Sequence, residues 1–292
     1  MNLAVISSTS ALAMAGTLVF TALLILGRKL PWILRRRTRF HSSATNNPAE
    51  NLRTEWERLG QRRSLYLTPI LFFIVCALTL LLAEPTSSGF NLAGWQQVGV
   101  LAIVGIALAG ALYRGIQYSL RRQQLQFKIE ASQTIGHALR QITANHNRTF
   151  HDVPCALGIV DHVLVGIHGI YAIKVIARRA GKSNLLTLSE QTLDFADGRY
   201  SVPLAETRKI VDRFARECGK VVGHEVHVRL VVAVPGWEIN TQSDDNILIT
   251  NERNLAMLTG WKDQRDHLLN EDAEALQQYL DERCARSAVP GA

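Results

Sequence analysis

Side chains able to do chemistry gather around one short segment of the chain. The run VDHVLVG at 160–166 contains Asp161, and three histidines lie in or near it: His151, His162 and His168. Imidazole nitrogens and carboxylates are groups that exchange protons and bind metals near neutral pH. No two of these histidines have the His-x-x-x-His spacing of a helical zinc pair. We therefore expect hydrogen-bonded structural histidines around Asp161 rather than a zinc site.

The motifs of several common enzyme classes are missing from the sequence. There is no Walker-type glycine loop for nucleotide phosphates and no Gly-x-Ser-x-Gly elbow of a serine hydrolase. No two cysteines have Cys-x-x-Cys spacing, so neither a zinc ribbon nor a disulfide framework is indicated. The four cysteines are Cys76, Cys155, Cys218 and Cys284. We expect them to be ordinary small apolar residues.

The elements that must position Asp161 alternate between helices and strands. Apolar residues recur at helical spacing over 128–144, and two β-rich runs follow within 156–177. Further predicted elements are strands within 187–202, a helix after Pro203, strands over 226–234 and 246–250, and a helix over 272–283. This order predicts an α/β or α+β domain with a mixed sheet.

Taken in order, the residues of these elements resemble the nuclease-related domain (NERD) family of the PD-(D/E)xK, restriction-endonuclease-like superfamily. The resemblance covers residues 136–237, about a third of the chain. It rests on Ile135-Gly136 in the first helix, VDHVLVG at 160–166, HGIYAIKV at 168–175 and the helix after Pro203. Family members have a Gly-Glu pair in the first helix and then an Ile-Asp-His strand. A Gly-Ile strand ending in Glu-Thr-Lys and a helix with a Gln follow. The resemblance implies a restriction-endonuclease-like α/β domain with a mixed sheet.

Only part of the family's metal site is kept in this sequence. Metal-dependent hydrolysis of a phosphodiester uses carboxylate oxygens on a hard cation. The resemblance places the strand aspartate at Asp161 and the helix Glu at His137. It places the strand Glu at Lys174, the strand Lys at Ile176 and the helix Gln near Glu206. Asp161 and Lys174 are then expected to neutralise each other. We predict a degenerate site that holds no cofactor.

An active nuclease is the main alternative. Glu206 would replace the missing strand carboxylate, and His137 would supply a nitrogen ligand if the metal were Mn²⁺ rather than Mg²⁺. Asp161 would then be a metal ligand of a metal-dependent DNA or RNA endonuclease. The competing interpretation of Glu206 is a solvent-exposed helix position paired with Lys209 at i,i+3.

A basic turn follows the second β-rich run. Arg178, Arg179 and Lys182 lie within five residues and are candidate contacts for nucleic-acid phosphates. Residues 114–292 contain 22 basic and 21 acidic side chains, so a solvated loop is the competing interpretation. Most of the chain's formal net charge of +7 therefore lies before residue 114.

The N-terminal part has a different character. Three uncharged apolar segments, at about 4–26, 64–83 and 95–113, each match the roughly 20 residues that span a bilayer as a helix. The loop at 28–63 carries ten basic and three acidic side chains, and the positive-inside rule places it in the cytoplasm. We therefore predict a multi-pass protein of the inner (plasma) membrane, with the N-terminus outside and the C-terminal domain cytoplasmic.

These observations predict a membrane anchor over 1–113, a juxtamembrane helical linker over 114–130, a nuclease-related domain over 131–286 and a tail over 287–292. The expected function is binding or scaffolding beside the lipid bilayer, with DNA, RNA or a protein as the partner. One alternative is the active nuclease described above. The other is a protein-interaction module with no connection to nucleic acid.

Overall fold

A computed structural model describes most of the chain, in eight segments. These are residues 47–63, 94–143, 147–179, 184–189, 192–196, 201–240, 247–260 and 266–287. The chain divides into two compact units, 1–41 with 57–122 and 42–56 with 123–292. The long helix α3 (Gly94–Ile142) contributes residues to both units.

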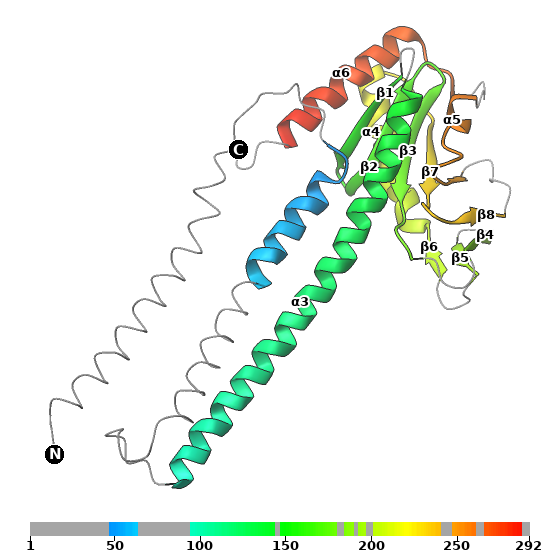
Figure 1. Cartoon of the computed structure of the whole chain (residues 1–292). Coiled ribbons are helices and arrows are strands. Elements are labelled where there is room, and N and C mark those ends of the chain that lie inside the picture. The colour runs from blue at the N-terminus through cyan, green and yellow to red at the C-terminus, as the bar shows by residue number, and fades with distance from the viewer. Residues whose placement is uncertain are drawn as a thin grey trace. The chain divides into compact units, whose positions relative to one another are not determined.

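The second unit is built on a five-stranded mixed sheet (Figure 1). Its strands are β1 (Arg148–Cys155), β2 (Gly158–Gly166), β3 (Gly169–Val175), β7 (Val228–Ala233) and β9 (Ile247–Thr250), in that order. β1, β2 and β3 pair antiparallel, whereas β3–β7 and β7–β9 pair parallel. The predicted α/β domain with a mixed sheet is therefore confirmed.

A second, four-stranded sheet has the order β6-β5-β4-β8. Its strands are β4 (Leu185–Ser189), β5 (Thr192–Phe195), β6 (Ser201–Pro203) and β8 (Glu238–Ile239). The remaining labelled helices are α4 (Ala205–Val222), α5 (Met257–Gly260) and α6 (Asn270–Ser287), and residues 50–63 are also helical. The strands predicted within 187–202 correspond to parts of β4, β5 and β6.

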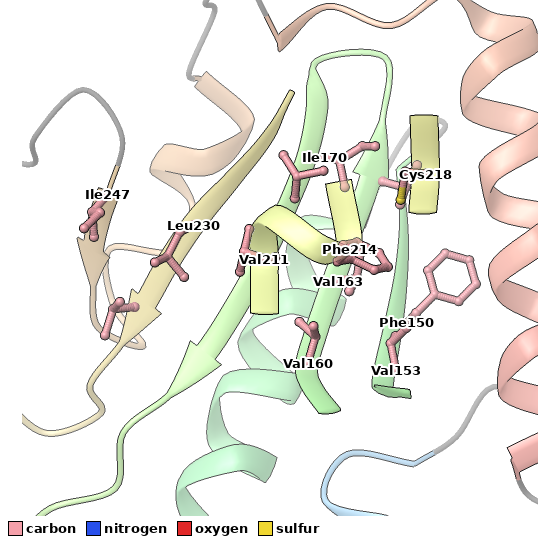
Figure 2. Close-up of a cluster of buried hydrophobic side chains, with 14 of the residues drawn as sticks. Phe150, Val153, Val160, Val163, Ile170, Val211, Phe214, Cys218, Leu230 and Ile247 are labelled. Atoms are coloured by element: carbon pink, nitrogen blue, oxygen red, sulfur yellow. The ribbon is translucent and has the colours of Figure 1, made fainter. Parts of the chain in front are cut away.

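Helices cover both faces of the larger sheet. On one face, Val163, Ile170 and Leu230 pack with Val211 and Phe214 of α4 in the main apolar cluster (Figure 2). The other face forms a second cluster with α3: Leu164, Tyr171, Ile173, Val231, Ala233 and Leu248 of the sheet with Ile135 and Leu139 of the helix. All six side chains of β7 are buried, as expected for a strand covered on both faces. The apolar strands β2, β3 and β7 thus lie in the middle layer, between α4 on one face and α3 on the other.

The membrane prediction is contradicted. In the parts of the chain that the structure describes, no helix is long and apolar enough to cross a membrane. The predicted segments 4–26 and 64–83 lie outside the described residues. The segment 95–113 is the first part of α3, which continues unbroken past Arg114 and Lys128 to Ile142. An uncharged run followed by basic residues therefore did not mark the end of a separate spanning helix. The anchor of three transmembrane helices and the inner-membrane localisation, including its orientation, were wrong.

Candidate functional site

Asp161 and Lys174 lie side by side on neighbouring strands. The pairing of His162 with Ile173 sets the antiparallel register of β2 and β3, which brings the preceding Asp161 opposite Lys174. Lys174 Nζ lies 3.0 Å from Asp161 Oδ1, and the backbone N–H of Val175 donates to Asp161 Oδ2 at 2.8 Å. The two side chains are 21% and 36% exposed. Both carboxylate oxygens of Asp161 therefore already have hydrogen-bond donors. Asp161 and Lys174 are partly exposed to solvent, and we call the region around them the Asp161 corner.

A second carboxylate, Asp152, completes this corner and was missed in the sequence. Asp152 lies in β1 between the pairs His151–His162 and Val153–Val160, at the position opposite Asp161, whose charge acts on it. Its φ of +52° is one that Asp tolerates better than most residues. Its side chain is buried, and Oδ2 accepts the N–H of Asn51 at 3.2 Å. Burial raises the pKa of Asp152 from 3.8 to about 6; the Asp161 charge adds to the rise, and the backbone N–H groups of Asn51 and Glu50 oppose it.

Two histidines form a buried hydrogen-bonded chain behind the corner. His151 Nδ1 lies 2.8 Å from His162 Nδ1, and His162 Nε2 lies 3.2 Å from the Ser132 hydroxyl of α3. Burial lowers the pKa of His151 to about 3 and that of His162 to about 4. Both rings are therefore neutral at pH 7, so one Nδ1–H donates to the lone pair of the other. This arrangement joins β1, β2 and α3 and leaves neither ring positioned as a surface base.

The other candidate ligands lie elsewhere. His137 is exposed on α3, and its Nδ1 lies 2.8 Å from the Gln133 carbonyl oxygen one helical turn earlier. Glu206 is exposed in the first turn of α4. No hydrogen bond or ion pair of the described residues joins either side chain to Asp161. Over the same described ranges, no three His, Cys, Asp or Glu side chains are grouped to hold a metal ion.

The basic turn begins at the same end of β3. The Arg178 guanidinium lies 4.7 Å from the centre of the Phe195 ring, and the Arg179 guanidinium lies 5.4 Å from that of Phe127. The Arg178 carbonyl accepts the Trp237 indole N–H at 2.9 Å. Arg179 is exposed, and Lys182 lies outside the described residues. Two of the three predicted phosphate contacts are therefore held by aromatic rings a few residues beyond Lys174.

A third aspartate anchors a separate polar cluster at the opposite end of β3 and β7. Asp266 is buried, and its Oδ2 accepts from Arg229 Nε at 2.9 Å and lies 2.8 Å from a terminal guanidinium nitrogen. His227 Nδ1 lies 2.6 Å from Asp266 Oδ1. Gly169, with a φ of +130°, allows this approach because a Cβ there would lie 2.9 Å from the Asp266 Cβ. The cluster fixes the segment before α6 against the sheet.

Comparisons with known proteins add no identification. No family model, no curated protein and no solved structure matches the chain. What this domain does is therefore inferred from its own side chains and topology.

Proposed function

We propose that the domain binds nucleic acid at the Asp161 corner without hydrolysing it, as a degenerate relative of the nuclease-related domain. The observation that carries this proposal is the ion pair between Asp161 and Lys174. In this pair Asp161, the one carboxylate that the resemblance assigns to metal binding, already contacts the ammonium group of Lys174.

The order of the elements supports the proposed relationship. Ile135-Gly136 lies in α3, the Asp161 strand pairs directly with the Lys174 strand, and α4 follows before the parallel strand β7. The resemblance calls for the same sequence of helix, aspartate strand, adjacent strand and helix.

The chemistry of the corner opposes metal-dependent hydrolysis. A Mg²⁺ ion on Asp161 would lie next to the Lys174 ammonium, and like charges in a partly buried site repel strongly. Asp152 lies opposite Asp161 on the neighbouring strand, and its Oδ2 accepts the N–H of Asn51. A hard cation at either carboxylate would therefore compete with these hydrogen bonds and, at Asp161, with the Lys174 ammonium.

The same corner has features suited to a phosphate backbone. Lys174 reduces the negative potential of Asp161, and the exposed Arg179 lies five residues beyond it. An arginine stacked on an aromatic ring still presents guanidinium N–H groups at its edges, and these bind phosphate oxygens well.

The test uses the full chain with plasmid DNA, linear duplex and single-stranded RNA, each in Mg²⁺ and then in Mn²⁺. We expect binding that weakens as salt rises from about 50 to 200 mM, with no cleavage. Arg179→Ala should weaken binding several-fold, as expected for the loss of a charge-assisted contact. Arg216→Ala, which removes an exposed arginine of α4, is the matched control and should change it less. Metal-dependent cleavage that Asp161→Ala abolishes would overturn the proposal in favour of an active nuclease.

A protein partner is the second candidate, because residues 114–292 are nearly neutral in charge. Specific nucleic-acid binders usually present a clear excess of basic side chains. Failure to bind DNA or RNA even at low salt would favour this candidate over the first.

A further inference from the structure

A short segment before the helix at residues 50–63 packs tightly against the Asp161 corner. Pro48 lies so close to Gly136 of α3 that a Cβ on the glycine would be 2.6 Å from its ring Cγ. The same Cβ would lie 3.6 Å from His151 Cε1. Ala49, the next residue, is only 1% exposed. The absence of a side chain at Gly136 thus makes a notch that Pro48 fills.

The start of this helix depends on a side chain from a distant strand. A helix leaves its first N–H groups without intrahelical partners, and a side-chain oxygen normally caps them. Ala49 has no such oxygen, and Asp152 of β1, 101 residues away from Asn51 in sequence, accepts the Asn51 N–H instead. Removal of this contact would leave both the helix start and a buried carboxylate without that partner.

The backbone is strained at both sides of the contact. Ala49 has a φ of +63° and Asp152 a φ of +52°, and no other non-glycine residue in the described segments has a positive φ. For alanine this conformation costs about 1 kcal/mol or more, and it persists only where the surroundings enforce it. The positive φ of Ala49 therefore depends on the packing of this segment against Gly136. If the segment detaches, we expect Ala49 to return to a negative φ.

We propose that residues 47–51 form a releasable strap that closes over Gly136 and Asp152, and that undocking of the strap opens this corner of the sheet. The strap lies in the second unit, but the residues before and after its segment, 1–41 and 57–122, belong to the first. The device is independent of the proposed nucleic-acid function, because it concerns access to the corner and not the ligand.

Gly136→Ala in the full chain tests the strap. Alanine is favoured over glycine inside a helix, so α3 is retained, while the new methyl group occupies the position of Pro48. We expect hydrogen exchange to accelerate roughly tenfold or more in peptides covering 47–56 and also in those covering 148–155. Gly110→Ala, on the same helix at a position where no atom of the described residues lies within 4 Å of the added Cβ, is the matched control and should leave both regions unchanged.

A second variant, Asp152→Ala, removes the cap without touching the notch. It should accelerate exchange over 47–56 as Gly136→Ala does, whereas β7 keeps its protection in both variants. Wild-type protection of 47–56 in both variants overturns the strap. Faster exchange of 47–56 with no change at 148–155 in Gly136→Ala overturns its role as a cover for the corner. DNA binding is measured separately, so failure of the proposed function is distinguishable from failure of the strap.

Discussion

Asp266 and Asp161 each lie about 3 Å from a basic side chain, but the two ion pairs differ in their exposure to solvent. Asp266 and Arg229 approach to 2.8 Å with 2% and 3% of their side chains exposed. Asp161 and Lys174 approach to 3.0 Å with 21% and 36% exposed. The shortest distances are similar, but Arg229 contacts Asp266 through two guanidinium nitrogens and the two pairs differ in access to water.

This difference decides what each pair can contribute. A charge left alone in a buried site has no water to solvate it, and breaking a buried pair costs about 3–5 kcal/mol. An exposed pair is typically worth about 0–1 kcal/mol, because water solvates either partner once the other is gone. We therefore expect the buried pair to contribute more to the stability of the fold than the partly buried Asp161–Lys174 pair.

The largest expected effect is that of Arg229→Met, which leaves the Asp266 carboxylate buried with the His227 ring 2.6 Å from its Oδ1. We expect the free energy of unfolding to fall by about 3–5 kcal/mol, measured by urea denaturation of the full chain. Arg229→Lys is the control. It keeps the charge but loses the guanidinium geometry, so its loss should be smaller. A loss below about 1 kcal/mol for Arg229→Met would remove the energetic distinction between the two pairs.

An intermediate effect is expected at Asp152, a buried aspartate with no basic partner among its hydrogen bonds. Its pKa in the folded protein, about 6, lies above the ordinary 3.8, so the folded state binds the proton more tightly. The resulting stabilisation is complete below about pH 4 and is lost as the pH rises through 6, where the buried carboxylate ionises.

Asp152→Asn removes this ionisation but keeps an oxygen for the Asn51 N–H and tolerates the positive φ. We expect the variant to be more stable than wild type at pH 7.5, by up to about 3 kcal/mol, because two pKa units correspond to that energy. Urea denaturation at pH 4 and pH 7.5 measures the difference, which should nearly vanish at pH 4. An equal difference at both pH values would show that ionisation of Asp152 is not its cause.

Local patterns predicted four of the five strands of the larger sheet but missed β1 (Arg148–Cys155). The expectation that Asp161 and Lys174 neutralise each other came from the resemblance, which places both in one site. β-branched runs predicted β2, β3 and β7. These features depend on a few neighbouring residues, so they are visible in a single sequence.

The features that sequence reasoning missed depend on distant parts of the chain. Asp152 caps a helix 101 residues away, and no nearby residue indicates this partner. Asp266 is buried in contact with Arg229 and Gly169, which come from two different strands. The membrane prediction is contradicted on other grounds, because no helix in the described part of the chain is long and apolar enough to cross a membrane.

The smallest expected effect on stability is that of Lys174→Met, and it sharpens the comparison most. Methionine keeps the apolar stem of the lysine, and Asp161 keeps the Val175 N–H and access to water. We expect the free energy of unfolding to change by less than about 1 kcal/mol. Lys220→Met, at an exposed position of α4, is the control for loss of one surface charge and should behave alike in this assay.

The two variants should separate in salt-dependent DNA binding, because only Lys174→Met leaves Asp161 without its neutralising partner, facing the phosphates. A stability loss close to that of Arg229→Met would mean that the Asp161–Lys174 pair holds the fold, and the corner would lose its standing as a binding surface.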